Sequence, residues 1–265
     1  MRKKFRNRLK GITKPQNSNL NYVLHQITVL WVCEKAYRMK KYKYILIAFV
    51  LILLSIFWAN EIWTGWVRHY EIFAKWLKSS KFHYYPWYLW LLAGEIIFPL
   101  MNRFFEKNIK IIKTATHELT HMITGMIFLQ RIKSIYAEEQ GTGVVWLYGN
   151  NFTHLLTDLA PYCFPIYTFP LLGLRCLCQP TLYPVIDVII GLTAGLHIIC
   201  FKEQTSSQQS DINKHPIWFS FIYIISVWLF DIALIILSYL PKLNIFLSFK
   251  LMAIDFWHVI TAIFA

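Results

Sequence analysis

Long apolar stretches recur along most of the chain, and the first one is the clearest. Residues 44–60 read YILIAFVLILLSIFWAN and contain no charged side chain. A helix needs about 20 consecutive apolar residues to cross about 30 Å of hydrocarbon. Further apolar stretches cover about 85–102, 105–129, 153–177, 183–201, 216–239 and 245–265. The pattern predicts an all-α polytopic membrane protein with about six or seven transmembrane helices.

One segment between these stretches has a different pattern. Residues 131–150 read RIKSIYAEEQGTGVVWLYGN, in which Gly-Thr-Gly separates two short β-prone runs and Gly-Asn ends the second. Such punctuation is typical of two strands joined by a turn. We therefore expect a short β-hairpin directly after the helix predicted at 105–129.

Composition and charge agree with a membrane protein. Of the 265 residues, 56% are hydrophobic and only 15% are charged, whereas soluble domains have about 45–50% and about 25%. Lys and Arg number 27, and 12 of them lie in residues 1–43, before the first apolar stretch. This bias predicts a cytoplasmic N-terminus. We expect a basic segment at 1–43 and a multi-pass transmembrane domain at 44–265, whose partner is the lipid bilayer and not nucleic acid.

The most specific motif lies within the stretch at 105–129, where residues 117–121 read HELTH. On a helix, His117 and His121 share one face, so both can bind a single Zn²⁺. Glu118 then lies beside the ion and can take a proton from a bound water. Ionisable residues inside a membrane span are costly and usually functional. The motif therefore predicts a zinc hydrolase site with Glu118 as the general base.

Three consecutive features resemble the site-2 protease family and its smaller relatives. They are THELTHMITG at 116–125, the glycine-containing hairpin and LAPYCFP at 159–165, and the resemblance covers about 105–215. It implies an intramembrane zinc metallopeptidase that hydrolyses a peptide bond of a membrane-associated protein or peptide substrate. It also implies that His117 and His121 are ligands and Glu118 the base. The family's usual third-ligand motif, an Asp-Gly after an Asn-Pro turn, is absent.

Four residues compete to be the third zinc ligand. At 1.5 Å per residue, His197 lies roughly 7–8 Å past the middle of its span, and Asp187 lies about as far on the other side. Small residues one turn before His197 permit close helix approach. Asp158 opens its span, and Asp211 lies in a polar loop that must fold inward to reach the metal. Depth therefore favours His197, with Asp158 and Asp211 as the alternatives.

A different class of protein is also compatible with the motif. A non-catalytic polytopic protein, such as a transporter or receptor subunit, would use His117, Glu118 and His121 to bind a metal or relay protons. A third hypothesis keeps the zinc but makes the substrate a lipid or another amide. The response of activity to a change at Glu118 separates the enzymes from the non-catalytic protein.

Overall fold

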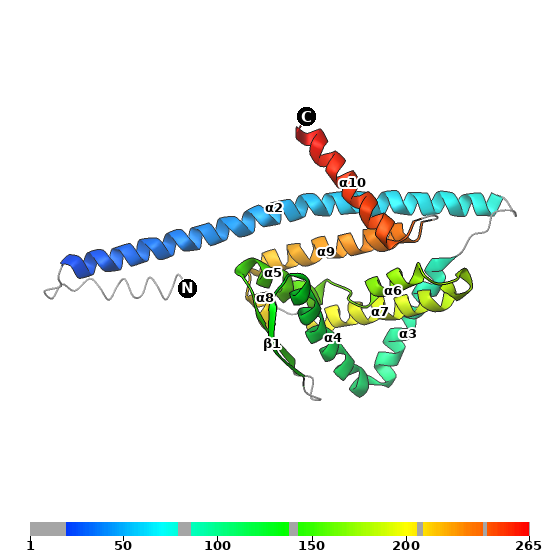
Figure 1. The fold of residues 1–265 in the computed structure, drawn as a ribbon, viewed down its shortest axis with the longest axis horizontal. Helices are drawn as coiled ribbons and strands as arrows, with labels where there is room; N and C mark the ends of the chain where they lie inside the picture. Colours follow the sequence, from blue (N-terminus) through cyan, green and yellow to red (C-terminus); the bar gives the residue numbers. More distant parts are fainter. Residues whose placement is uncertain (1–19, 79–85, 138–142, 206–208, 241–242, 265) are drawn as a thin grey trace. The chain divides into compact units, whose positions relative to one another are not determined.

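The computed structural model describes residues 20–78, 86–137, 143–205, 209–240 and 243–264, and most of these are helical (Figure 1). The chain divides into two compact units, residues 1–47 and 48–265. Helix α2 (Leu20–Lys78) supplies the described part of the first unit. Of the predicted basic segment 1–43, residues 1–19 lie outside the described residues and the rest belongs to α2.

The second unit begins within α2 and contains all of the remaining elements. In chain order they are α3 (Trp87–Phe104), α4 (Glu106–Ile127), β1 (Arg131–Ala137), β2 (Gly143–Tyr148), α5 (Asn151–Leu159), the 3₁₀ turn η1 (Ala160–Tyr162), α6 (Thr168–Arg175), the 3₁₀ turn η2 (Pro180–Leu182), α7 (Tyr183–Gln204), α8 (Ser210–Asn213), α9 (Ile217–Ser238) and α10 (Ile245–Phe264).

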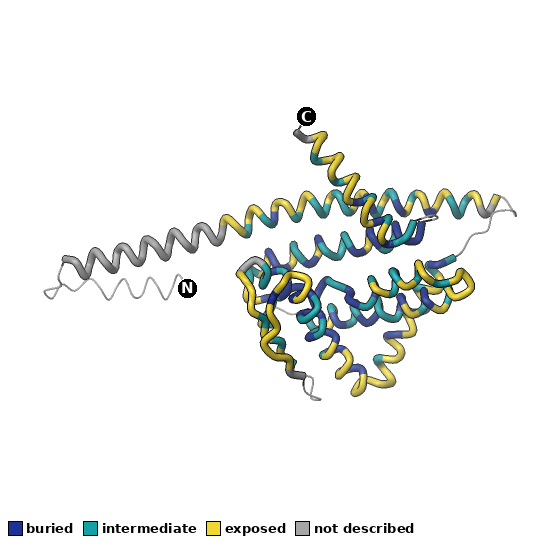
Figure 2. The backbone as a smooth tube through the Cα atoms, viewed as in Figure 1, coloured by how far each residue is buried: buried dark blue, intermediate teal, exposed yellow. Residues whose placement is uncertain are grey.

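Four of the described helices are long and apolar enough to cross a membrane. They occupy Tyr42–Lys75 within α2, Pro180–Gln204, Ile217–Ser238 and Ile245–Ala262. These helices are consistent with an integral, multi-pass membrane protein, as the sequence predicts. Figure 2 shows that α7 and α9 contain many buried positions, whereas α10 and the part of α2 from Tyr42 to Lys75 are mainly exposed or half-buried. The prediction of six or seven spans was wrong for the described part of the chain.

Charged residues and prolines explain the smaller number of spans. Helix α3 is only 18 residues long and contains Glu95, Pro99 and Arg103. Helix α4 has three lysines among its first eight residues. The stretch 153–177 is not one helix, because η1, which contains Pro161, separates α5 from α6. Proline removes a backbone donor and clashes with the preceding turn, so it interrupts a helix.

The predicted β-hairpin is confirmed. Strands β1 and β2 pair antiparallel, with Arg131 opposite Tyr148 and Ile135 opposite Val145. The register shifts between Ile132 and Ser134, which indicates a bulge. Leu129, just before β1, has a φ of 56°, a left-handed conformation that turns the chain out of α4 and into the hairpin. The hairpin therefore begins directly beside the helix that contains the HELTH motif.

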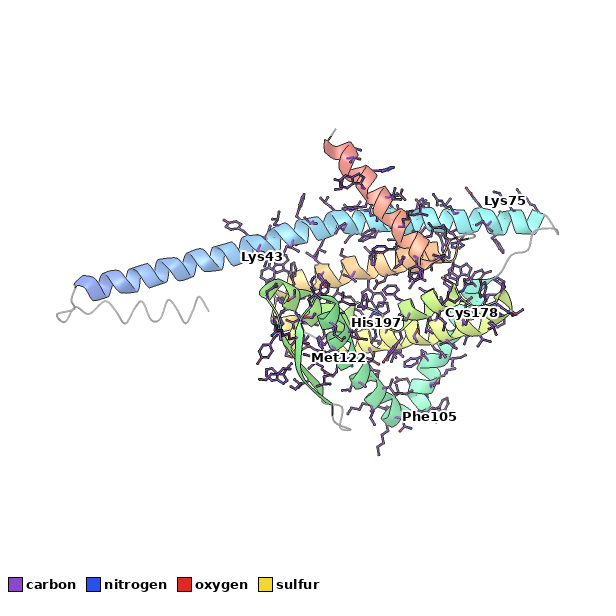
Figure 3. All side chains as sticks on the ribbon, viewed as in Figure 1. Lys43, Lys75, Phe105, Met122, Cys178 and His197 are labelled. Carbon is purple, nitrogen blue, oxygen red and sulfur yellow. The ribbon has the colours of Figure 1, made fainter. Side chains whose placement is uncertain are left out.

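Helices α3 and α7 pack closely because glycines lie at their contact. A Cβ atom at Gly94 would overlap the Val188 carbonyl oxygen, and one at Gly191 would overlap the Leu91 carbonyl oxygen. Small residues allow helix backbones to approach in this way in membranes. Phe105 forms the turn between α3 and α4 (Figure 3). The α3–α7 contact thus fixes the point from which α4 begins.

Helix α9 contacts the second-unit part of α2 through two polar side chains. His69 Nε2 donates to the Ile236 carbonyl at 2.9 Å, and Ser226 Oγ donates to the Leu51 carbonyl at 3.2 Å. The main apolar core combines residues of α3, α7, α9 and α10, with Ile190 and Ala233 fully buried. These contacts place α7 and α9 at the centre of the apolar core, with α3, α6 and α10 packed against them.

Candidate metal centre

Helix α4 presents the two histidines of the HELTH motif on one face, as the four-residue spacing predicts. The ring centroids of His117 and His121 are 4.9 Å apart. His121 is buried and His117 is half-buried. The helix is not among the four candidate membrane spans, but its second half is packed by β1, β2, η1 and α5. The histidines therefore lie inside the protein and not at a lipid-facing surface.

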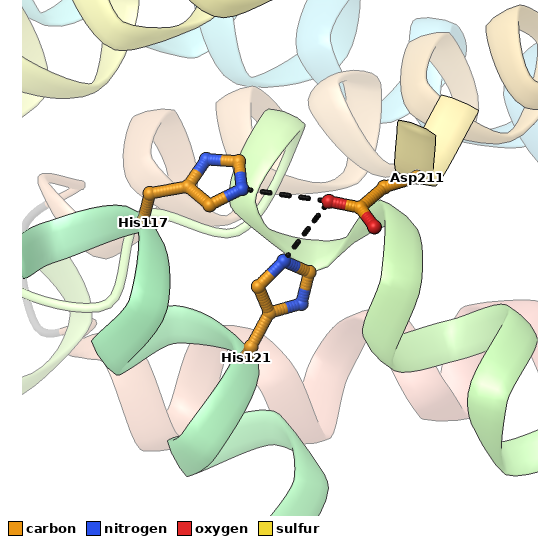
Figure 4. A group of neighbouring side chains, drawn as sticks. All are labelled: His117, His121 and Asp211. Carbon is orange, nitrogen blue, oxygen red and sulfur yellow. Dashed lines mark ion pairs between the residues drawn. The ribbon is translucent and has the colours of Figure 1, made fainter. Parts of the chain in front are cut away.

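Asp211 lies between the two histidines, although it is about 90 residues further along the chain. Its Oδ2 atom is 3.6 Å from His117 Nε2 and 3.3 Å from His121 Nε2 (Figure 4). Among the described residues, these three form the one group of His, Cys, Asp or Glu side chains whose ligand atoms all lie within 4.8 Å of one another. Asp211 comes from α8, a four-residue helix in the connection between α7 and α9.

The outer nitrogen of each histidine has its own partner. His121 Nδ1 donates to the Thr157 carbonyl at 2.8 Å, and His117 Nδ1 is 3.0 Å from the side-chain oxygen of Gln204. An imidazole that keeps its proton on Nδ1 can offer the Nε2 lone pair to a metal ion. Partners of this kind fix the tautomer of metal-binding histidines in other proteins. Both Nε2 atoms therefore face Asp211.

Lys214 holds the opposite side of the Asp211 carboxylate. Its Nζ atom is 2.9 Å from Asp211 Oδ1 and 3.0 Å from Asp158 Oδ1. Burial alone would raise the pKa of Asp211, but hydrogen bonds from the two histidines and Lys214 lower this pKa well below its ordinary value. Asp211 is therefore ionised at neutral pH, with Oδ2 free of Lys214 and directed toward the imidazoles.

Glu118 lies next to the first residue of β2. A Cβ atom added to Gly143 would be 2.5 Å from Glu118 Cγ and 2.8 Å from Oε1. The backbone N–H of Val145 donates to the Glu118 carboxylate. Burial raises the pKa of Glu118, while the two histidines oppose that shift. A carboxyl group with a raised pKa is better suited to accept and return a proton near neutral pH.

The other two carboxylates predicted as candidate ligands have partners outside the cluster. Asp158 is bound by Lys214 and lies 3.3 Å from His215 Nε2. Asp187 is fully buried, and it accepts hydrogen bonds from Arg175 at 2.7 Å and from the Tyr239 hydroxyl at 2.7 Å. Asp187 thus anchors the start of α7 to α6 and α9.

His197, which the depth ranking favoured, also lies outside the cluster of His117, His121 and Asp211. Its ring stacks on Trp228 at 5.2 Å between centroids, and one ring nitrogen hydrogen-bonds the Cys163 backbone. Figure 3 labels this residue on α7. The structure therefore brings Asp211, and not His197, to the two histidines of α4.

Sequence reasoning missed Tyr162, which is fully buried on η1. Its ring lies edge-on to the His117 ring, with centroids 5.5 Å apart. Burial, together with the nearby carboxylates of Asp211 and Glu118, raises the pKa of its phenol. Among the described residues, the Tyr162 hydroxyl has no hydrogen-bond partner. Such a buried, unsatisfied group costs about 1–3 kcal/mol.

The donor set of this cluster fits a divalent metal. Two imidazole nitrogens and one carboxylate oxygen are ligands that Zn²⁺ accepts, and three protein ligands leave a fourth position open for water or substrate. The Glu118 carboxylate and the Tyr162 ring lie beside this donor set. No protein-family model, no curated protein and no solved structure matches this chain.

Proposed function

We propose that this protein is a membrane-embedded zinc metallopeptidase that hydrolyses a peptide bond of a membrane-associated substrate. The observation that supports this most is the position of Asp211 Oδ2, 3.6 Å and 3.3 Å from the Nε2 atoms of the HELTH histidines. Its support is geometric: a carboxylate distant in sequence faces the two nitrogens that the motif offers to a metal. In this proposal His117, His121 and Asp211 hold the zinc.

Residues around the three ligands keep them in position. Thr157 and Gln204 fix the two imidazoles through their Nδ1 atoms, and Lys214 orients the Asp211 carboxylate. Changes to such outer partners typically lower metal affinity about 10–100-fold in other proteins. The proposal therefore includes these three residues as positioning residues for the metal.

Glu118 has the central chemical role in the proposed reaction. When bound, Zn²⁺ would polarise the substrate carbonyl and lower the pKa of its water toward about 7. Glu118 accepts a proton from the attacking water. The water oxygen forms a bond to the carbonyl carbon, and the π electrons of the carbonyl move onto the carbonyl oxygen. When those electrons return, the C–N bond breaks and Glu118 gives its proton to the leaving nitrogen. The products are a carboxylic acid and an amine.

Strand β2 offers a way to hold the substrate. Among the described residues it pairs with β1 along one edge only, and its Gly143 and Val145 touch Glu118. An extended peptide can add to a free strand edge through backbone hydrogen bonds. The hairpin would thus align an unfolded segment of a membrane protein past Glu118, since an extended chain exposes its peptide bonds better than a helix does.

Metal content tests the ligand set. Purified protein in detergent should contain about one zinc per chain, and His117→Ala, His121→Ala and Asp211→Ala should each lose it. His197→Ala should keep its zinc, because that ring lies outside the cluster. A folded wild type without zinc would contradict the proposal. Loss of zinc in His197→Ala but not in Asp211→Ala would instead make His197 the third ligand.

Cleavage tests the base. We would reconstitute the protein in liposomes with a set of tagged single-span peptides and identify fragments by mass spectrometry. Glu118→Gln should keep its zinc and its thermal stability but lose at least about 10²-fold in rate, since it removes a general base. Glu106→Gln, an exposed position on the same helix, is the matched control and should cleave normally. Equal cleavage by both variants would show that Glu118 is not the base, whereas a zinc-loaded wild type that cleaves no peptide would favour a non-catalytic metal-binding protein.

A further inference from the structure

The buried hydroxyl of Tyr162 has no role in the chemistry described so far. Tyr162 is 0% exposed, and its hydroxyl has no hydrogen-bond partner among the described residues. Most buried polar groups in proteins have such a partner, so each exception calls for an explanation. The neighbours of Tyr162 provide an explanation, because this residue is close to His117 on α4 and to the carboxylates of Glu118 and Asp211.

The backbone around Tyr162 is held firmly. Trp228 on α9 donates from its indole nitrogen to the Tyr162 carbonyl at 2.9 Å, and the same indole stacks on His197. His197 in turn hydrogen-bonds the backbone of Cys163, the next residue along the chain. Pro161 fixes the preceding turn. Contacts from α7 and α9 therefore fix the backbone that carries the Tyr162 side chain.

We propose that the Tyr162 hydroxyl donates a hydrogen bond to the substrate carbonyl oxygen as that oxygen gains negative charge during peptide hydrolysis. The inference rests on the proposed function and adds a catalytic residue to it. A phenol is protonated at neutral pH, so it is a donor. A donor without a ground-state partner loses no existing bond when the charged oxygen forms, and preorganised donors of this kind stabilise transition states strongly.

This role and a packing role predict different results for Tyr162→Phe. If the hydroxyl only fills space, its removal deletes an unsatisfied polar atom and leaves activity unchanged. If it contacts the reacting oxygen, the variant is at least as stable as the wild type and keeps its zinc, but its kcat falls about 10²–10³-fold, the usual effect of removing one such donor. Tyr167→Phe is the matched control, because the Tyr167 hydroxyl accepts a hydrogen bond from Thr116 and belongs to no part of the proposed machinery.

Inhibitor affinity provides a readout that is independent of turnover. We would compare a Leu-Ala dipeptide phosphinate, whose tetrahedral P–O⁻ group imitates the charged oxygen, with a hydroxamate of the same dipeptide. Tyr162→Phe should weaken phosphinate binding about 10²-fold and change hydroxamate binding less than about threefold. Tyr167→Phe should bind both inhibitors as the wild type does. Isothermal titration on zinc-loaded protein in detergent measures all six affinities.

The outcomes separate this inference from the proposed function. If the wild type cleaves and binds the phosphinate but Tyr162→Phe matches it within twofold in both, the role of Tyr162 is refuted and the peptidase remains. Loss of zinc in Tyr162→Phe would also refute the catalytic role of Tyr162, because it would show that the hydroxyl is needed to build the metal site. If the wild type holds zinc but neither cleaves nor binds either inhibitor, the proposed function itself fails, and the role of Tyr162 with it.

Discussion

The contact between Gly143 and Glu118 allows the proposed base to be displaced without changing its chemistry. In Gly143→Ala, the new Cβ atom would be 2.5 Å from Glu118 Cγ, whereas ordinary contacts of a Cβ atom begin at 3.4 Å. One of the two groups must therefore move by about 1 Å. The Glu118 side chain is flexible, while Gly143 is held in a strand by its pairing with Ala137. We expect the glutamate to move.

The size of that displacement sets the expected effect. A misplacement of about 1 Å in a reacting group can cost about 10²-fold in rate, so kcat in the liposome cleavage assay should fall by about that factor. Because Glu118 is not one of the proposed ligands, the zinc content should stay at about one per chain. Because a side chain can turn aside, the free energy of unfolding should change by less than about 1 kcal/mol.

A second glycine supplies the control for this substitution. Among the described residues, a Cβ atom at Gly173 would meet only Phe246 Cζ, at 3.8 Å, which is an ordinary contact. Gly173→Ala should therefore retain full activity. Wild-type cleavage by Gly143→Ala would refute the reasoning, since it would mean that Glu118 need not occupy its position beside β2. A loss of zinc together with activity would contradict the assignment of Glu118 as a base that binds no metal.

Two further predictions concern stability and metal affinity. Gly191→Ala should lower the free energy of unfolding by about 3 kcal/mol, as strong overpacking does, because its Cβ would overlap the Leu91 carbonyl oxygen; thermal unfolding in detergent checks this against Gly173→Ala, and equal stability would contradict the close α3–α7 contact. Lys214→Met should weaken zinc binding about 10-fold through the lost hydrogen bond to Asp211; competition with a chelator measures this, and unchanged affinity would exclude a positioning role for Lys214.

The helical membrane class, the hairpin and the histidine pair could be predicted because each depends on local spacing. Apolar length predicts spans, Gly-Thr-Gly predicts a turn, and a separation of four residues places His117 and His121 on one face. The number of spans could not be predicted equally well. Averaged apolarity across 153–177 does not reveal that Pro161 divides the stretch into two short helices. The prediction of a span at 105–129 gave too little weight to the lysines of α4, which is not among the candidate spans.

The depth ranking placed His197 ahead of Asp211, because it treated every residue as fixed at the level of its own helix. Asp211 belongs to a connection, and its position depends on contacts of its neighbours. Ile212 is fully buried and its carbonyl accepts a hydrogen bond from Ser220 at 3.2 Å, which holds α8 inside the protein. The spacing of Asp211 and Lys214 on one helical turn was the only local signal, and such pairs are common on surfaces.

Charge balance gives an independent reason to expect a divalent ion in this cluster. Glu118, Asp211 and Asp158 are buried or nearly so, and Lys214 is the one Lys or Arg that contacts these carboxylates among the described residues. The group thus has an excess of two negative charges when all three acids are ionised. Unpaired charge is costly to keep away from water. A dication held by His117, His121 and Asp211 would make the site neutral, whereas a third histidine in place of Asp211 would leave it positive.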